Sequence, residues 1–195
     1  MNRSFEDLLA EIRACRICAD ALPHEPRPVL QVHPDAPILI AGQAPGRRVH
    51  ATGVPFDDPS GDRLRDWLGV TKEVFYDPRR VAILPMGFCF PGSGSSGDLP
   101  PRRECAPAWR EAVLGHLPDA RLTLVLGAYA QKYHLGSKAK SVTEVVKAWR
   151  SHWPAALPLP HPSPRNRAWF ARNVWFEDEI LPALRARVRE LLDAR

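Results

Sequence analysis

The chain has 195 residues, of which 45% are hydrophobic and 25% are charged, and it carries a formal net charge of +5 with a pI of about 9.3. This composition is typical of a globular protein, and no apolar run is long enough to cross a bilayer, which argues against a membrane role. The basic balance favours a polyanionic partner, and the length favours a single domain spanning residues 1–195.

The N-terminal residues 1–7 read Met-Asn-Arg-Ser-Phe-Glu-Asp, which are acidic within the first turns and lack the apolar core of a signal peptide. We therefore expect a protein that is not exported and that works in the reducing cytoplasm. No feature of the sequence calls for an obligate protein partner.

Short apolar runs alternate with helical patterns along the whole chain. Buried strands are predicted at residues 37–42, 81–87, 121–127 and 156–160. Helices are predicted at residues 62–68, 104–117, 128–135 and 141–149, followed by one long amphipathic stretch over 167–192. This alternation predicts a three-layer α/β/α domain around a central, mostly parallel four-stranded sheet.

The segments that follow the predicted strands are rich in glycine, proline and polar residues. Residues 42–46 read Gly-Gln-Ala-Pro-Gly, residues 87–92 follow the second strand, and His161 follows the fourth. Because ligands of such sheets bind beyond the carboxyl ends of the strands, these loops are expected to meet at one edge. The glycine and serine run within residues 91–101 is predicted to be a mobile excursion.

The loop at residues 161–166 reads His-Pro-Ser-Pro-Arg-Asn. Its two prolines lack backbone donors and have a fixed φ, so the segment cannot continue a helix or a central strand and must present its polar side chains outward. Turns of this composition are also common without any function. The loop alone leaves both interpretations open.

Residues 53–56 read Gly-Val-Pro-Phe and stand between the Gly42 turn and a predicted helix. In this order, the Gly42 turn, the Gly-x-Pro-Phe segment and the His161 loop resemble the motifs of the uracil-DNA glycosylase superfamily. The resemblance anchors the chain from its N-terminal helix to its last strand. It implies a monofunctional DNA glycosylase of base-excision repair that flips uracil out of DNA and hydrolyses its N-glycosidic bond.

Four cysteines stand at positions 15, 18, 89 and 105. Their number leaves both buried free thiols and a metal site open, and the wide separation of the last two does not fit a zinc ribbon. The pattern is similar to that of the iron-sulfur glycosylases of families 4 and 5. That similarity implies that Cys15, Cys18, Cys89 and Cys105 ligate a structural [4Fe-4S] cluster, with a four-cysteine zinc site as the alternative.

The resemblance also implies roles for residues of the base pocket. Phe56 would stack on the flipped base, and His161 would stabilise the negative charge that develops on the base oxygen as the bond breaks. The remaining candidates for contact with the base are Gly42, Gln43, Ala44, Gly46 and Met86.

The sequence departs from better-known families where they carry a carboxylate in the first motif. This chain has Gln43 or Ala44 there, and neither side chain can act as a base. Asp58 is the candidate for activating water, since residues 58–62 resemble a family-5 stretch with an aspartate, and Asp57 is its substitute. In the alternative interpretation, these carboxylates only cap the helix that begins near Ser60.

A second departure follows the strand at residues 81–87, where many relatives place an asparagine that reads uracil. Pro85, Met86 and Gly87 occupy this stretch. Base selection must then use backbone groups, Gln43 or the shape of the pocket, so we expect substrates that include hypoxanthine and xanthine.

Contacts with DNA are expected around the His161 loop. Ser163 and Asn166 are candidates for phosphate contacts, and Arg165 stands where relatives insert a side chain into the vacated stack. Further charge contacts are expected from Arg47, Arg48 and Arg167, so binding should weaken steeply with salt.

Two other functions compete with this interpretation. A non-catalytic relative would bind damaged DNA without turnover, which the missing motif carboxylate and asparagine make reasonable. An unrelated nucleotide-binding enzyme could use the Gly42 turn for a phosphate, but Pro45 removes an amide donor from that turn and no P-loop lysine follows.

Overall fold

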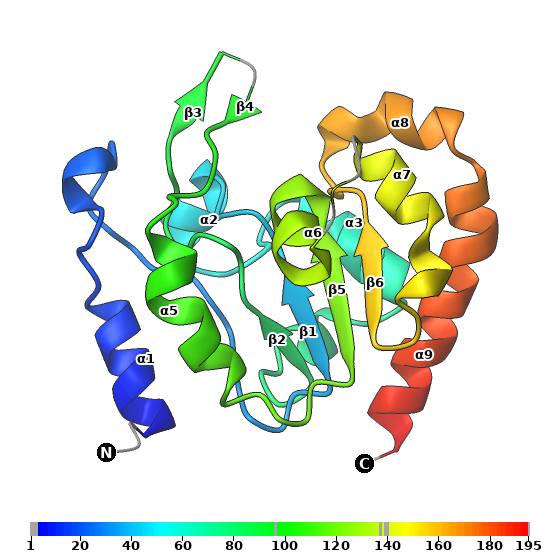
Figure 1. Ribbon diagram of the computed structural model, residues 1–195, viewed down its shortest axis with the longest axis horizontal. Helices are drawn as coiled ribbons and strands as arrows, with labels where there is room; N and C mark the ends of the chain where they lie inside the picture. The colour runs from blue at the N-terminus through cyan, green and yellow to red at the C-terminus, as the bar shows by residue number, and fades with distance from the viewer. Residues whose placement is uncertain (1–3, 96, 137, 139–140, 195) are drawn as a thin grey trace.

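The computed structural model describes residues 4–95, 97–136, 138 and 141–194. Its centre is a parallel sheet with the strand order β2-β1-β5-β6 (Figure 1). The strands are β1 (Ile38–Ala41), β2 (Val81–Ile83), β5 (Leu122–Leu126) and β6 (Ala156–Leu159). The predicted four-stranded sheet is therefore confirmed, and all of its neighbouring strands run in parallel.

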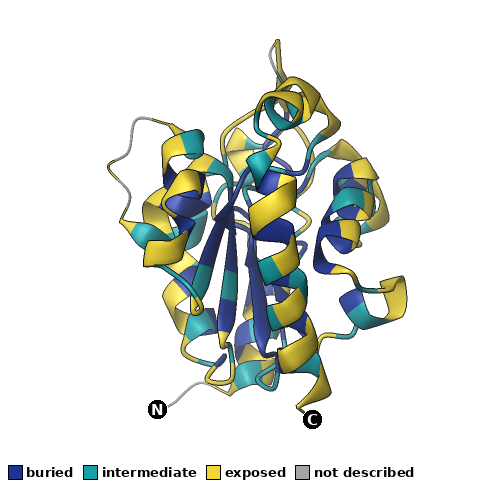
Figure 2. Ribbon diagram, turned by 90° about the vertical axis from the view of Figure 1, so that its right-hand side faces the viewer, coloured by how far each residue is buried: buried dark blue, intermediate teal, exposed yellow. Residues whose placement is uncertain are grey.

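Helices cover both faces of this sheet, which appears as a buried layer in Figure 2. Alternate strand residues explain the two sides: Ile38 and Ile40 pack into one hydrophobic cluster, whereas Leu39 packs into another. The first face is covered by α3 (Pro59–Leu68), α7 (Val142–Lys147) and α9 (Leu181–Asp193). The second face is covered by α1 (Phe5–Arg13), α5 (Cys105–Leu114) and α6 (Gly127–Leu135). The three-layer α/β/α prediction is confirmed.

Side-chain caps and glycines set the ends of the helices near the carboxyl edge. The Asp58 carboxylate accepts a hydrogen bond from the Gly61 backbone N–H at 2.9 Å and begins α3, with Pro59 in its first turn. The short helix α2 (Arg47–Thr52) ends at Gly53, whose φ of 75° is left-handed. Another short helix, α4 (Lys72–Phe75), leads into β2. The sequence patterns did not reveal α2 or α4.

The long helical stretch predicted at residues 167–192 is broken into α8 (Arg167–Arg172), a π-helical turn η4 (Phe176–Ile180) and α9. At the break, the Asn173 side-chain amide donates to the Trp169 carbonyl at 2.7 Å. An asparagine side chain that bonds locally in this way competes with the backbone ladder of a helix. Trp169 and Phe176 also pack against each other across the break.

A small antiparallel hairpin lies within residues 91–101, the segment predicted to be a mobile excursion. Its strands are β3 (Ser93–Gly94) and β4 (Gly97–Asp98), and Ser96 lies outside the described residues. The hairpin rises above the carboxyl edge of the main sheet (Figure 1). Short 3-10 turns complete the fold at Ala19–Ala21, Trp149–Ser151 and Pro164–Asn166.

Among the described residues, none forms a helix that is both long and apolar enough to cross a bilayer.

Candidate active site

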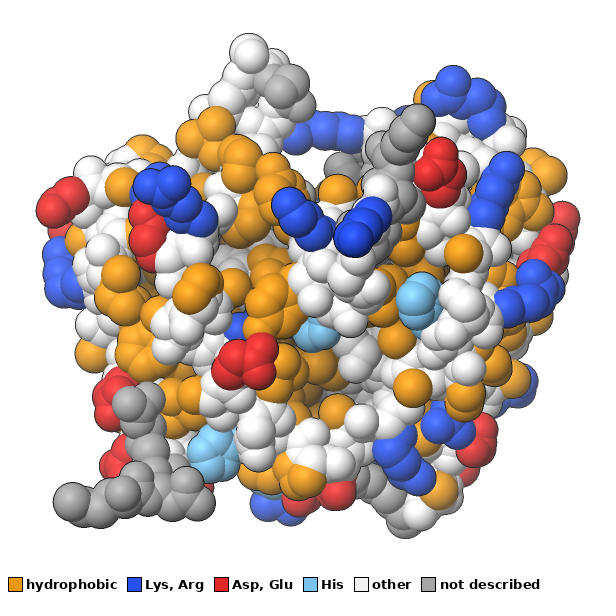
Figure 3. Space-filling view, viewed as in Figure 1, with side chains coloured by type: hydrophobic (Ala, Val, Ile, Leu, Met, Phe, Trp, Pro, Cys, Tyr) orange, Lys and Arg blue, Asp and Glu red, His pale blue; other side chains and the backbone are white. Residues whose placement is uncertain are grey.

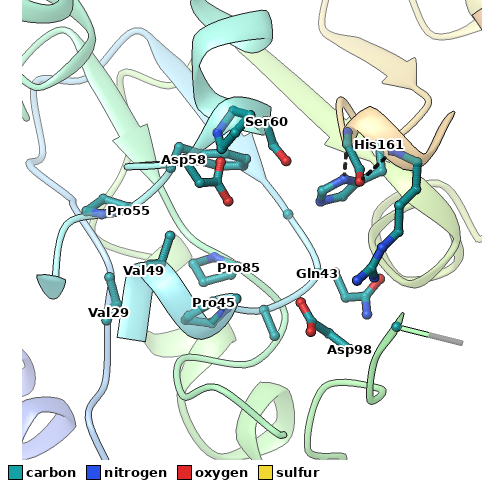
Figure 4. A pocket seen from close by; sticks show the side chains of 18 of the residues that line it. Val29, Gln43, Pro45, Val49, Pro55, Asp58, Ser60, Pro85, Asp98 and His161 are labelled. Atoms are coloured by element: carbon teal, nitrogen blue, oxygen red, sulfur yellow. Dashed lines mark hydrogen bonds between the residues drawn. The ribbon is translucent and has the colours of Figure 1, made fainter. Parts of the chain in front are cut away.

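A pocket of about 490 Å³ opens at the carboxyl edge of the sheet. Its wall is formed by the Gly42 turn, the segment that leads into α3, the end of β2, the β3–β4 hairpin and the His161 loop (Figure 4). Lysine and arginine side chains gather along the upper part of the same face, near the hairpin and α8 (Figure 3). The volume suits a single flipped base, and the surrounding charge suits a nucleic-acid backbone.

His161 presents a defined tautomer to this pocket. The Ser163 backbone N–H donates to His161 Nδ1 at 3.2 Å, so this nitrogen carries the lone pair and the proton of the neutral ring is on Nε2. Burial lowers the pKa of His161, although the nearby carboxylates of Asp58 and Asp98 act in the opposite direction. The ring is therefore a neutral Nε2–H donor at neutral pH.

Hydrogen bonds from three directions hold the His161 loop. The Asn166 side-chain amide donates to the His161 carbonyl at 2.7 Å, and Arg63 on α3 donates to the carbonyls of Pro162 and Ser163, each at 3.2 Å. The buried Gln131 amide on α6 donates to the Leu159 carbonyl at 3.0 Å. Because partners on α3 and α6 fix this segment, the imidazole has a defined position before any ligand binds.

Phe56 lies on the pocket wall in a left-handed conformation with a φ of 55°. The Tyr76 hydroxyl donates to its carbonyl at 3.3 Å, and its ring meets Phe75 edge-on at 6.2 Å. A Cβ atom at Gly61 would lie 1.8 Å from the Phe56 carbonyl oxygen, so only glycine fits there. The strained backbone of Phe56 is therefore maintained by its close approach to α3.

The two candidate carboxylates differ in position. Asp58 lies on the pocket wall opposite His161 and uses Oδ1 to cap α3, which leaves Oδ2 free (Figure 4). Asp57 is absent from the described lining of the pocket, although the charges of both Asp57 and Asp58 act to raise the pKa of Tyr76. The capping role and the pocket position of Asp58 are thus compatible, whereas Asp57 lies outside the described lining.

The remaining predicted residues fall into two groups. The pocket lining includes Gly42, Gln43, Ala44, Gly46, Ser163, Arg165 and Asn166. The residues that lie outside that lining are Arg47, Arg48, Arg167 and Met86.

For Met86, the predicted base contact requires correction. Its backbone N–H donates to the Gly42 carbonyl at 2.8 Å, while its side chain is buried among Ala41, Val125 and Ala130. Its neighbour Pro85 forms the pocket wall instead.

A comparison with protein families agrees with this geometry. The family described as the uracil DNA glycosylase superfamily matches residues 30–185, which contain all four strands of the sheet and the described pocket lining except Val29. The chain belongs to the uracil DNA glycosylase superfamily. Membership supports a DNA glycosylase that acts on a DNA substrate. The matched region begins after Cys15 and Cys18, so it leaves the iron-sulfur subgroup unassigned.

Asp98 is a pocket residue of this superfamily member that sequence reasoning missed. It lies on β4, lines the pocket, and accepts a hydrogen bond from the Ser93 hydroxyl at 3.0 Å through Oδ1. The signal in the sequence was slight, since Asp98 is the only charged residue within residues 91–101.

The four cysteines line a second, small pocket of about 20 Å³ between the N-terminal segment and α5. The indole N–H of Trp109 donates to Cys15 Sγ and the Phe88 backbone N–H donates to Cys105 Sγ, both at 3.3 Å. Burial, with a smaller contribution from the neighbouring thiols, raises the pKa of Cys89 to about 11 and that of Cys105 to about 12. Within the described residues, no group of His, Cys, Asp or Glu side chains is arranged to hold a single metal ion.

Arg27 connects the pocket lined by the four cysteines with the larger pocket at the carboxyl edge of the sheet. Its guanidinium donates to the carbonyls of His50 and Ala51 at the end of α2, at 2.7 and 2.6 Å. Its backbone amide lies beside the Cys89 thiol and acts to lower the pKa of that thiol, against the larger effect of burial. One residue thus joins a cysteine to the helix that immediately precedes the Phe56 segment.

Proposed function

We propose that this protein is a monofunctional DNA glycosylase of base-excision repair that releases uracil, hypoxanthine and xanthine from DNA. The observation that carries the proposal is the neutral His161 ring, whose Nε2–H faces a base-sized pocket that also contains Phe56. An enzyme that acts on a base must first extrude it from the stack, and an aromatic ring beside a polar donor suits a flipped base.

The proposed reaction breaks the bond between C1′ and the base nitrogen, and the bonding electrons leave with the base. His161 Nε2–H donates to the base oxygen that gains negative charge, so the interaction strengthens as the bond breaks. Water then adds to the oxocarbenium-like C1′, and its proton passes to the free Oδ2 of Asp58. The products are the free base and an abasic site.

The reaction is proposed to stop at the abasic site. A glycosylase with lyase activity needs an amine nucleophile, and none of the described residues that line the pocket is a lysine.

DNA contacts are proposed for the rim of the pocket. The Ser163 oxygen accepts from the Arg165 backbone N–H at 3.2 Å, which leaves its hydroxyl hydrogen for a phosphate. Asn166 already donates to the His161 carbonyl, so its proposed role includes positioning the histidine. Arg165, with Arg47, Arg48 and Arg167 outside the pocket lining, supplies positive charge along the strand.

We also propose that Cys15, Cys18, Cys89 and Cys105 hold a [4Fe-4S] cluster. The chemistry of the donor set fits, since four thiols line one pocket, and two of them receive N–H hydrogen bonds, Cys15 from Trp109 and Cys105 from Phe88. Each cysteine of such a cluster binds a different iron, so its ligands need not surround a single ion. The cluster would be structural and would join the N-terminal segment to α5, in a protein that works in the reducing cytoplasm.

The cofactor can be tested on the purified protein. We expect iron and acid-labile sulfide in equal amounts together with broad visible absorbance, and Cys105→Ala should lose all three. Zinc without sulfide would contradict the cluster and favour the four-cysteine zinc site.

The activity can be tested with oligonucleotides that contain uracil, hypoxanthine or xanthine in single and double strands. Abasic sites formed by the protein are cleaved with alkali and the products are measured, with His161→Ala as the control. We expect release that depends on His161. Binding of the same DNA without release would support the non-catalytic relative, and release of uracil alone would contradict the proposed purine substrates.

A further inference from the structure

Several of the polar side chains in the pocket already use an atom to hold the fold. Asp58 Oδ1 accepts from the Gly61 N–H, His161 Nδ1 accepts from the Ser163 N–H, and the Asn166 amide donates to the His161 carbonyl. The side chains of Asp98 and Gln43 make fewer or longer hydrogen bonds within the fold, and neither has a role in the proposed bond-breaking step. They lie beside each other on the wall opposite Asp58 (Figure 4).

Asp98 offers the pocket an oriented acceptor. Its Oδ1 accepts from the Ser93 hydroxyl at 3.0 Å, which fixes the carboxylate and leaves Oδ2 without a hydrogen bond inside the hairpin. Oδ2 is directed toward the Gly46 backbone, where an added Cβ would lie 3.3 Å from it. Asp98 and His161 both line the pocket, and the charge of Asp98 acts to raise the pKa of His161. An ionised carboxylate only accepts hydrogen bonds.

Gln43 offers a donor next to this acceptor. Its Nε2 is 3.5 Å from the carbonyl of Leu99, the residue after Asp98, which is the long limit of a hydrogen bond. The amide can therefore exchange this weak contact for a better acceptor in the pocket. An N–H donor and a carboxylate acceptor thus stand side by side, on a turn after β1 and on β4 respectively.

We propose that Asp98 and Gln43 together read the lactam edge of the flipped base. Asp98 accepts the ring N–H, and the Gln43 amide donates to the adjacent ring carbonyl. This inference rests on the proposed glycosylase function and gives its base selectivity a structural origin. Base selection is thereby assigned to the Asp98 carboxylate on the hairpin and the Gln43 amide on the turn after β1. This chain has no asparagine after β2 to perform it.

The lactam is the group that deamination creates. Cytosine and adenine present a ring nitrogen lone pair beside an amino group, and hydrolysis converts this edge to a ring N–H beside a carbonyl in uracil and hypoxanthine. A lone pair facing Asp98 would leave the carboxylate unpaired and repelled, whereas an N–H satisfies it. Thymine and guanine also carry a lactam, so their exclusion depends on the shape of the pocket and on the stability of their base pairs.

The test compares uracil with N3-methyluracil, whose methyl group replaces the ring N–H. Single-turnover release of each base from single-stranded oligonucleotides is measured for the wild-type protein and for Asp98→Ala, Asp98→Asn and Gln43→Ala. Asp178→Ala removes an equivalent charge from an exposed position on η4 and serves as the control.

We expect the wild-type protein and the Asp178→Ala control to prefer uracil strongly. Asp98→Ala should reduce this preference by about 10-fold to 100-fold, as expected for the loss of a hydrogen bond to a charged acceptor. Asp98→Asn keeps the size of the side chain and an acceptor oxygen, so it should show a smaller reduction. Gln43→Ala should slow the release of both bases, since both keep the carbonyl.

Different results would overturn the proposed base contact alone or the proposed glycosylase function with it. An Asp98→Ala variant that slows both bases equally would overturn the proposal, because a merely structural role of the hairpin predicts that result. Equal release of both bases by the wild-type protein would also overturn it while leaving the glycosylase function intact. A wild-type protein that releases neither base, from single or double strands, would overturn the proposed function and this inference with it.

Discussion

The two sides of the pocket are built in different ways. On the His161 side, the loop after β6 is held by side chains from α3 and α6, each of which is fixed by the main core. On the hairpin side, Asp98 is exposed, and its carboxylate accepts a hydrogen bond from Ser93. The next residue, Leu99, is held by the long contact of its carbonyl with the Gln43 amide. That hairpin lies between Cys89 and Cys105, so the thiol pocket brackets it.

This difference separates two tasks. In the proposed reaction, the developing charge is stabilised by a donor that is already in place, and this is the role proposed for His161. In the same proposal, the hairpin carries the carboxylate that contacts the flipped base, and Ser93 rather than the main core orients it. We therefore expect that substitutions at the cysteines destabilise the hairpin side of the pocket, and that substitutions near Phe56 and His161 destabilise the sheet side.

The largest effect is expected from Cys105→Ala. Loss of the proposed cluster should release the hairpin and the N-terminal segment and cost about 5 kcal/mol or more of local stability, by analogy with structural metal sites. Hydrogen exchange should become faster in residues 4–36 and 87–105 while β5 and β6 stay protected. Cys89→Ala should reproduce the pattern. Unchanged protection around the hairpin would show that the thiols do not hold this side.

Gly61→Ala should damage the sheet side of the pocket. The added Cβ would meet the Phe56 carbonyl at 1.8 Å, so we expect a loss of about 3 kcal/mol or more in the free energy of unfolding and a displaced Phe56. Gly115→Ala is the matched control, since φ is −61° there and the nearest contact is an ordinary 3.5 Å. Urea denaturation of both variants measures the difference. Equal stabilities would contradict the close approach of Phe56 to α3.

Acid should weaken the core next to the pocket through His134. Its Nε2 accepts from the buried guanidinium of Arg110 at 3.1 Å, and burial together with that charge lowers the pKa of His134 to about 4. The unfolded chain then binds a proton that the native protein does not, so stability is fully present above pH 6.5 and is lost as the pH falls toward 4.

The contribution of His134 to this loss is about 2 kcal/mol, because the site is partly exposed. His134→Gln keeps an acceptor for Arg110 but cannot titrate, so its urea midpoint should depend less on pH between 4 and 6.5. His161 and His50 act in the same direction, so some dependence remains. A variant whose pH profile matches that of the wild-type protein would refute the assignment.

The smallest effect is expected for single cations at the rim. Arg165→Ala should weaken DNA binding and reduce the slope of log K against log salt by about 1 if it meets one phosphate. Arg189→Ala on α9 provides the control, because that residue is exposed on the helix layer away from the pocket loops. Fluorescence anisotropy across a salt series distinguishes the two. Identical slopes would exclude Arg165 from the contact.

The sheet side was largely predictable from the sequence, for a physical reason. Strands buried on both faces must be continuously apolar, so residues 37–42 and 121–127 identified β1 and β5 to within about a residue. His161 was found because prolines on both sides restrict the backbone to a loop. Asp58 was found as both a cap and a pocket residue because one carboxylate oxygen suffices for the cap.

The hairpin side was less predictable because its structure depends on contacts distant in the sequence. Glycine and serine carry little intrinsic preference, so the pairing of β3 with β4 had no local signal and the position of Asp98 had only a slight one. The Met86 side chain turns into the core while Pro85 forms the wall, a choice that alternation along the chain did not reveal. Likewise, the break at Asn173 follows from one side-chain hydrogen bond rather than from periodicity.

The most direct test of the account is the single-turnover rate of uracil release by His161→Ala. Loss of the Nε2–H donor should reduce that rate by about 10²-fold to 10³-fold, while DNA binding stays near that of the wild-type protein. His152→Ala, on the half-buried turn before β6, should release uracil at the wild-type rate. Release by His161→Ala at the wild-type rate would contradict the central role given to this histidine.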